Sequence, residues 1–417
     1  MKPFRSTIPL EDALAIVRDA IVPIARTERV PIEAAHGRVL ATTIAATADV
    51  PAFTRSAMDG YAVIAADTQN ASRDRAVTLK LAGRLYAGDT SDRGDTITSG
   101  VCMEIATGAP LPGGADAVVM VEDTSIAASA EIDVFAAVRQ GQHVVRRAAD
   151  MRQGDVVLQP GVTLEPSRVG ALAAIGIAEV EVFAKPVVAI LPTGNELVTP
   201  GKPLPPGHVY DMNRYTLGAL VERHGGVARQ LPAVIDTPEA VREALDSVNG
   251  SGSGSESNSS APVDLLIFCG GSSVGERDLV IDALREKGEV LFHGIAVKPG
   301  KPTAFARIGT TTLVLGMPGN PTSCLSNAYV LMIPLLRAIA RLPAARPTVV
   351  RAPLSQRVTS PRDRLQFLPV RIEDGKAMPT FKGSGEITSL SQADGYITIP
   401  LETDVVEAGT PVDVTLY

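Results

Sequence analysis

Three glycine- and proline-rich turns between residues 264 and 327 carry side chains suited to anion and metal binding. Two turns follow the apolar segments VDLLIFC and TTLVLGM, and the other interrupts HGIAVKPGKPTAFA. Lys298 and Lys301 supply ammonium groups, which bind tetrahedral oxyanions, and a Gly-Gly-Ser-Ser sequence offers backbone N–H donors before a predicted helix. Asp278, and Glu196 after an earlier apolar segment, are hard oxygen donors of the kind that Mg²⁺ prefers beside phosphate. The pattern predicts an anion site with a divalent metal.

The elements that must position these side chains form a predicted sheet. The apolar segment 264–269 does not alternate with polar residues, as is typical of a parallel strand buried on both faces. From Lys185 onward such segments alternate with amphipathic helices, which predicts an α/β multi-domain fold with a doubly wound parallel sheet. Ligands bind such sheets at the carboxyl ends of the strands, so the three turns are expected to gather there.

Individual elements of this region follow from local signals. Strands are predicted at VVAILP and QLPAVI, and a helix at RYTLGALVERH, which ends in Gly-Gly. The helix at TPEAVREALDSV has Thr237 as its N-cap. A helix at 322–341 is apolar nearly all round and therefore buried, and Pro334 should kink it.

The rest of the chain is mostly β-rich. An amphipathic helix is predicted at 9–21, short strands at 77–154, and a small β domain at 348–417. The Gly/Ser-rich insertion at 249–260 cannot bury apolar surface and is predicted to be a surface loop without a role in the site.

Two polar segments in the β-rich part have both a structural and a functional interpretation. PAFTRSAMDGYAV is either a well-packed turn or a loop that presents Ser56 and Asp59 to a ligand. The Arg146-Arg147 pair, just before Asp150, is either a solvated edge or a fork for phosphate oxygens. The residues alone leave both alternatives open.

Composition limits the class of protein. A chain of 417 residues exceeds one ordinary core, so two to four domains are expected. The net charge of −7 and the absence of tryptophan argue against nucleic-acid binding. Cys102, Cys269 and Cys324 are too widely spaced for a disulfide framework or a zinc site. Without a signal-peptide pattern or an uninterrupted apolar run of about 20 residues, we expect a cytoplasmic protein that does not bind membranes.

Several common catalytic motifs are missing from the sequence. It has no GxxxxGK[ST] loop, no GxGxxG after a strand, no GxSxG and no HExxH. Walker-type nucleotide hydrolysis, Rossmann-type dinucleotide binding and these hydrolase mechanisms are therefore excluded.

Six motifs, in order, resemble those of the molybdopterin molybdenumtransferase family, the bacterial MoeA family related to the gephyrin E domain. They are PAFTRSAMDGYAV, ATGAPLPGGADAVV, LPTGNELV, GGSSVGERD, KPGKPTAFA and GMPGNPTSC. The resemblance implies an elongated homodimer whose active site is shared between subunits, and a molybdopterin-binding α/β domain similar to MogA. It also implies four parts: 1–26 with 178–342, 27–45 with 155–177, 46–154, and 343–417.

The resemblance further implies a reaction and a set of functional residues. The expected reaction is Mg²⁺-dependent insertion of molybdate into adenylylated molybdopterin, with release of AMP, and transient contact with the adenylyltransferase is expected. Catalytic roles are implied for Asp59, Asp150, Asp278, Lys298 and Lys301, and metal binding for Glu196 and Asp278. Substrate or nucleotide contacts are implied for Thr107, Arg147, Gly194, Asp236, Gly271, Ser272, Pro318, Asn320, Pro321, Ser323, Arg364 and Ser384.

The sequence departs from the family pattern at three places. Thr54 stands where the family often has Asp, so the capping of that loop is expected to differ. Pro369 occupies the most direct match to a molybdate-contacting arginine, which leaves Arg364 and Arg371 as candidates, and Ser384 is likewise a candidate. Two other functions also fit the motifs: a non-catalytic scaffold that retains the fold, and insertion of tungstate in place of molybdate.

Overall fold

The chain folds into two units in the computed structural model, which describes residues 7–90, 96–248, 262–270, 279–309 and 311–417. Unit 1 comprises Met1–Glu28, Gly37–Val39 and Phe183–Tyr417. Unit 2 comprises Arg29–His36 and Leu40–Val182. The predicted surface loop at 249–260 lies outside the described residues.

Unit 1 is built on a six-stranded sheet with the order β16-β13-β17-β21-β20-β18. The strands are β13 (Val187–Pro192), β16 (Val227–Gln230), β17 (Leu265–Cys269), β18 (Gly288–His293), β20 (Ala304–Ile308) and β21 (Thr312–Met317). β16, β13, β17 and β21 are parallel, as predicted, whereas β20 is antiparallel to both neighbours. The predicted parallel sheet is therefore confirmed, with one antiparallel strand, β20, next to its β18 edge. The connection from β20 to β21 is too short for the crossover that parallel strands need.

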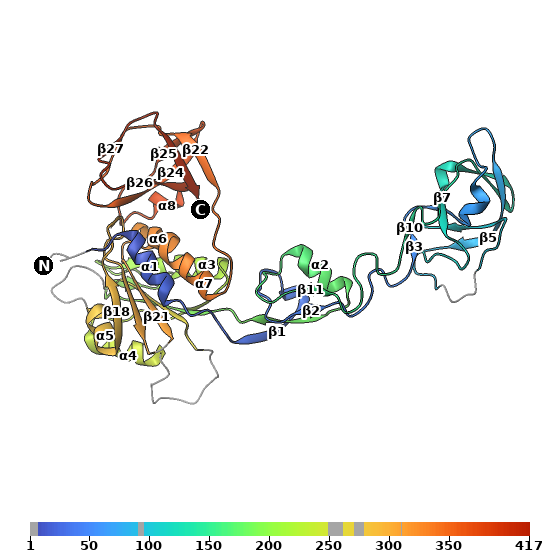
Figure 1. The fold of residues 1–417 in the computed structure, drawn as a ribbon. Helices are drawn as coiled ribbons and strands as arrows, with labels where there is room; N and C mark the ends of the chain where they lie inside the picture. Colours follow the sequence, from blue (N-terminus) through green and yellow to red (C-terminus); the bar gives the residue numbers. More distant parts are fainter. Residues whose placement is uncertain (1–6, 91–95, 249–261, 271–278, 310) are drawn as a thin grey trace. The chain divides into compact units, whose positions relative to one another are not determined.

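Helices cover both faces of this sheet, which confirms the doubly wound architecture (Figure 1). One face is covered by α1 (Leu10–Ala20), α3 (Asn213–Arg223), α6 (Pro321–Asn327), η5 (Ala328–Met332) and α7 (Ile333–Ile339). The other is covered by α4 (Pro238–Val248) and α5 (Leu279–Lys287). Successive strand residues alternate between the two cores: Leu265 and Ile267 lie in the first, and Leu266 and Phe268 in the second. The predicted N-cap is confirmed, because Thr237 Oγ1 accepts the Ala240 N–H at 3.3 Å.

The predicted strand QLPAVI is wrong in its position. β16 ends at Gln230, just before Leu231-Pro232, and only an isolated bridge joins Val234 to Thr193. Pro232 has no N–H to donate to a neighbouring strand, so regular pairing stops before it.

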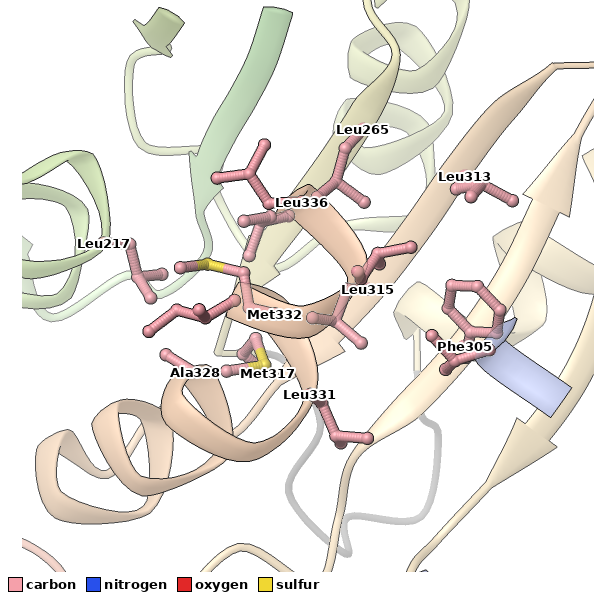
Figure 2. Packing of buried hydrophobic residues seen from close by; sticks show 14 of the residues in the cluster. Leu217, Leu265, Phe305, Leu313, Leu315, Met317, Ala328, Leu331, Met332 and Leu336 are labelled. Atoms are coloured by element: carbon pink, nitrogen blue, oxygen red, sulfur yellow. The ribbon is translucent and has the colours of Figure 1, made fainter. Parts of the chain in front are cut away.

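The apolar helix predicted at 322–341 is observed as α6, η5 and α7 in succession. Its central residues Ala328, Leu331 and Met332 pack against the sheet near Leu315 and Met317 (Figure 2). The regular α-helix is interrupted at the expected place by the π-helical turn η5, which ends two residues before Pro334, because a proline cannot complete the bond to the residue four positions earlier. Residues 321–339 are long and apolar enough to span a bilayer, yet 67% of the most apolar window is buried within the protein, as in a core helix.

The C-terminal part of unit 1 is a second sheet, which confirms the predicted β-rich tail. Its order is β19-β24-β26-β28-β22, with β25 paired to β24. The bounds are β19 (Val297–Lys298), β22 (Val349–Pro353), β24 (Leu365–Glu373), β25 (Lys376–Pro379), β26 (Gly395–Ile399) and β28 (Pro411–Leu416), with β23 (Val358–Thr359), β27 (Val405–Val406) and α8 (Thr388–Ser391) beside them. β19 belongs to the lysine-bearing turn, so this turn joins the two sheets of unit 1, which the sequence did not indicate.

Unit 2 contains a six-stranded sheet with the order β7-β4-β6-β5-β9-β8, which confirms the predicted β-rich segment. The bounds are β4 (Gly60–Val63), β5 (Val77–Leu85), β6 (Val101–Ile105), β7 (Ala117–Met120), β8 (Thr124–Ala128) and β9 (Glu131–Val134). A separate core of Leu40, Leu164, Leu172 and Val182 lies among β2 (Ile44–Ala45), β11 (Val156–Leu158), α2 (Pro166–Ala174) and β12 (Glu179–Phe183). The division of the chain into four parts stays a prediction.

Candidate functional site

The carboxyl ends of the central strands of unit 1 lie at one edge of the sheet. Pro192 pairs with Cys269, and Cys269 with Met317, so β13, β17 and β21 end level with one another. Because β20 is antiparallel to β21 and starts beside Gly316, the connection from β18 to β20 also lies at this edge. This connection carries Lys298 and Lys301. The predicted gathering of loops is confirmed for those that the structure describes, whereas Gly271, Ser272 and Asp278 lie outside the described residues.

The segment 294–303, called here the dilysine loop, is held by a dense set of hydrogen bonds. The Lys301 carbonyl accepts the N–H groups of Ile295 at 3.0 Å and of Thr303 at 2.9 Å. The Gly300 carbonyl accepts the Thr303 hydroxyl at 2.9 Å and the Asn327 amide Nδ2 at 2.8 Å. The backbone that carries both lysines is therefore fixed from within the loop and from helix α6.

At the other end of the same edge lie two carboxylates, Glu196 and Asp236. Glu196 follows β13 beside the short pair β14 (Leu197–Val198) and β15 (Val209–Tyr210). Its carboxylate folds over Gly194, where a Cβ atom would lie 2.8 Å from Oε2. The Asp236 N–H donates to Asn195 Oδ1 at 3.1 Å. Burial, with the nearby Glu196 charge, raises the pKa of Asp236.

This carboxylate pair has the chemistry of a cation site. A divalent cation reduces the repulsion between two neighbouring carboxylates, and Mg²⁺ binds such hard oxygen ligands at sites where it also binds phosphate. In the described part of the chain no three His, Cys, Asp or Glu side chains form a metal cluster. A complete set of metal ligands would therefore need phosphate or water oxygens, or the predicted ligand Asp278.

The carboxylates and the dilysine loop occupy opposite ends of the edge. The strand order places β17 and β21 between β13, which precedes Glu196, and β20, which follows the lysines. Three strand spacings separate β13 from β20, which amounts to about 14 Å. The edge thus has an acidic end and a basic end, separated by roughly the length of an extended nucleotide-sized ligand.

Between these ends, the start of α6 meets the C-terminal sheet region. Asn320 Nδ2 donates to Ser384 Oγ at 3.1 Å, and the Thr322 N–H donates to the Ser384 carbonyl at 3.1 Å. The Asn213 amide holds the Gly319 carbonyl at 2.8 Å. The structure therefore brings together the predicted residues Asn320 and Ser384. Pro318, Pro321 and Ser323 lie in the same segment, with Ser323 buried.

Strand pairing brings one of the two candidate arginines to the dilysine loop. Lys298 pairs with Gln366, and Arg364 lies directly before β24, two positions from Gln366. Arg371 lies toward the far end of β24, on the opposite face, and pairs with Glu373. Arg364 is therefore the nearer of the two candidates to Lys298 in strand register, and its own side chain contacts Asp363.

In unit 2, Asp59 and Thr107 are in direct contact. Asp59 Oδ1 accepts the Thr107 backbone N–H at 2.7 Å and the Thr107 hydroxyl at 3.0 Å. These two donors, the backbone N–H first, lower the pKa of Asp59, which is therefore an exposed, ionised carboxylate. Asp59 fits the functional interpretation of the 51–63 loop, since a solvated charge is held in a defined position. The prediction that Ser56 is presented to a ligand is wrong, because Ser56 is buried and its hydroxyl bonds to the backbone of Met58.

The remaining predicted residues of unit 2 lie on an adjoining turn. The Arg147 N–H donates to Thr54 Oγ1 at 3.2 Å, so Thr54 caps this loop with its hydroxyl. Arg147 Nε contacts Asp49 Oδ2 at 2.5 Å, and the Asp150 N–H donates to the Val50 carbonyl at 3.0 Å. The side chains of Arg147 and Asp150 are exposed.

A small pocket beside Asp59 completes the description of unit 2. Its volume is about 180 Å³, and its lining includes Tyr61, Tyr86 and the ion pair of Arg84 with Glu104. Pockets that enclose a whole ligand usually measure 300–1,000 Å³. At this size the pocket can hold a small ligand or one portion of a larger ligand.

Three residues that shape these sites were not identified from the sequence. Asn327 binds the dilysine loop from a helix whose sequence is apolar nearly all round, and Gln366 is a buried partner of Lys298 in strand pairing. Asp49 accepts Nε of Arg147 and the Gln153 N–H. A buried polar residue within an apolar helix was the available signal for Asn327. The roles of Gln366 and Asp49 depend on contacts with residues distant in sequence, which local patterns do not show.

Comparison with known proteins agrees with this geometry. Three family models match in sequence: the MoeA N-terminal region (domains I and II) at 8–176, a probable molybdopterin binding domain at 189–338, and the MoeA C-terminal region (domain IV) at 351–417. These three matches cover most of the chain and assign it to the class of molybdopterin biosynthesis proteins.

Individual relatives narrow this class. The molybdopterin molybdenumtransferase of Haemophilus influenzae is 36% identical over 75% of this chain and 72% of its own, and that of Synechococcus elongatus is 34% identical over 96% and 97%. The crystal structure of the molybdopterin biosynthesis MoeA protein from Pyrococcus horikosii has a TM-score of 0.81 at 37% identity, over 99% of both chains. The chain belongs to the molybdopterin molybdenumtransferase family, whose members are transferases of molybdenum cofactor biosynthesis.

Proposed function

We propose that this protein inserts molybdate into adenylylated molybdopterin and releases AMP together with the molybdenum cofactor. The observation that carries the proposal is the two-ended edge of unit 1, with the dilysine loop at one end and Glu196 beside Asp236 at the other. The reaction must bind an oxyanion and cleave a metal-bound diphosphate. It therefore requires both the basic end and the acidic end of the edge. Family membership supports the reaction type.

Each end of the edge has a role in this reaction. Lys298 and Lys301, with Ser323 and Arg364, bind molybdate and offset its repulsion from the diphosphate. Gly194 and Asp236 belong to the acidic end, where the nucleotide phosphates would bind, and a carboxyl group with a raised pKa can donate a hydrogen bond to a phosphate oxygen.

A divalent cation fits the acidic end. Glu196 would hold Mg²⁺ together with Asp278, with Asp236 beside them, and the bound cation would neutralise charge on the diphosphate as AMP leaves. A prediction specific to this assignment is that Glu196→Gln raises the Mg²⁺ concentration needed for half-maximal AMP release, whereas the molybdate requirement stays the same.

We further propose that the active site is shared in a homodimer, in which Asp59, Thr107, Arg147 and Asp150 of one subunit complete the edge of the other. Cytoplasmic location and transient transfer of substrate from the adenylyltransferase are part of the same proposal. Support comes from the exposed, well-positioned charges of unit 2, since Asp59 is held ionised at the surface by Thr107.

The test of the reaction is AMP release from adenylylated molybdopterin by the purified protein. Release should require both molybdate and Mg²⁺, and Lys301→Ala should reduce it strongly while the unfolding transition is kept. Failure of the purified, folded protein to release AMP, when the Haemophilus influenzae relative does so in the same assay, would refute the proposed reaction.

The shared site has its own test in mixed dimers. Asp59→Asn and Lys298→Ala should each be inactive alone, because one damages unit 2 and the other unit 1. Co-refolded in equal amounts, half of the dimers are mixed and each has one intact site, so about a quarter of the wild-type rate should return. No recovery in dimers shown to be mixed would contradict a shared site.

A further inference from the structure

The dilysine loop is fixed by a buried carboxamide that no sequence motif includes. Asn327 is 0% exposed, and its Nδ2 donates to the Gly300 carbonyl at 2.8 Å and to Thr303 Oγ1 at 2.5 Å. Thr303 is also 0% exposed, and its hydroxyl donates in turn to the Gly300 carbonyl at 2.9 Å. These three residues form a closed triangle of hydrogen bonds under the turn between Lys298 and Lys301.

The triangle lies at a close approach of helix and loop. A Cβ atom at residue 300 would lie only 2.3 Å from Asn327 Nδ2, so a glycine is needed for the carboxamide to reach the loop. The next helical segment, η5, begins at Ala328, directly after Asn327. The Asn327 side chain thus fixes the lysine-bearing backbone relative to a buried helix.

The neutral charge of the triangle matters for anion binding. Two lysines in one turn repel each other, and a carboxylate could hold the turn by pairing with them. Such a pair would also cancel the positive charge that an oxyanion needs. An amide and a hydroxyl hold the Gly300 carbonyl instead, so these contacts add no negative charge to the turn.

We propose that Asn327 is a positioning residue for oxyanion binding, which it supports by holding the Gly300 carbonyl together with Thr303. The inference rests on the proposed function, because it takes the oxyanion to be molybdate. It extends that function by assigning the geometry of the dilysine loop to two buried residues that do not touch the substrate.

An isosteric pair of variants at Thr303 tests this role. Thr303→Val removes the hydroxyl and keeps the volume, whereas Thr303→Ser keeps the hydroxyl. Measured by calorimetric titration with sodium molybdate, Thr303→Val and Asn327→Ala should bind at least tenfold more weakly, about 1.4 kcal/mol. Thr303→Ser should bind within about twofold of wild type. Ser326→Ala is the control, since Ser326 is buried in the same helix and makes no side-chain hydrogen bond with the described part of the loop.

Kinetics separate positioning from a merely structural role. The variants should raise KM for molybdate while AMP binding and the maximal rate at saturating molybdate stay near wild type. Equal molybdate affinity in wild type, Asn327→Ala and Thr303→Val would overturn the positioning role alone. Equal loss of molybdate and AMP binding would also overturn it, since the damage would then be general. A wild-type protein that binds no molybdate would overturn the proposed function and this inference together.

Discussion

Substitution of Gly300 by alanine gives a quantitative test of how tightly the dilysine loop is packed. Gly300 has φ +109°, a conformation that alanine adopts at a cost of about 1–3 kcal/mol. The new methyl group would also lie 2.3–2.6 Å from the Asn327 side chain. Asn327 must then move and give up its bonds to Gly300 and Thr303, each worth about 1 kcal/mol. The expected loss in the free energy of unfolding is therefore about 3–5 kcal/mol.

The assay is urea unfolding with a matched control glycine. Gly309 has φ +60°, and no described atom lies within 4 Å of a Cβ built there, so Gly309→Ala carries the backbone cost without the clash, about 1–2 kcal/mol. Gly300→Ala combined with Asn327→Ala should be less destabilised than the sum of the two single variants, by about 1 kcal/mol or more. If Gly300→Ala costs no more than Gly309→Ala, or if the two single effects simply add, the described packing is wrong.

Two further predictions concern carboxylates of unit 1. Because burial and Glu196 raise the pKa of Asp236, its contribution to stability is present below its ordinary pKa of 3.8 and is lost as pH rises through the folded-state value. Asp236→Asn should therefore be more stable than wild type to urea at pH 7, with the difference shrinking as pH falls toward 3.8, while AMP release declines; a variant less stable than wild type at pH 7 would argue against this linkage. Asp264→Ala breaks the bidentate pair with Arg26 at 2.8 and 2.6 Å and should cost about 2–3 kcal/mol in urea unfolding. Asp282→Ala, at an exposed ion pair, should change stability by less than about 0.5 kcal/mol, and an equal effect of the two would contradict the assigned difference.

Local sequence signals were sufficient for most elements of unit 1. Apolar strands, the Thr237 cap and helical periodicity identified β13, β17, α1, α3 and α4, because each depends on residues close in sequence. The differences from the prediction have local causes as well. Pro232 follows the end of β16 and prevents regular pairing beyond it, and the short connection between β20 and β21 requires these strands to be antiparallel. Where the chemistry of one residue sets the backbone, the sequence was a reliable guide.

The supporting contacts of the site could not be predicted in the same way. The Asn327–Gly300 bond joins residues on different elements, and nothing in either local pattern indicates which partner a buried amide will find. The same holds for β19, whose pairing with β24 brings Arg364 nearer than Arg371 to Lys298 in strand register. Side-chain chemistry indicated the kind of site, whereas long-range pairing determined which residues hold it in place.

The order of strands explains why opposite charges can coexist at one edge without cancelling. Glu196 and Asp236 lie at the β13 end and the lysines at the β20 end, about 14 Å apart by strand spacing. At that distance the two groups are largely screened from each other in salt, since the Debye length is about 8 Å at physiological ionic strength. Each end therefore remains available for its own ligand. A molecule that bridges the edge, with an oxyanion at one end and a cation-bound phosphate at the other, would be recognised by its length as well as by its charge.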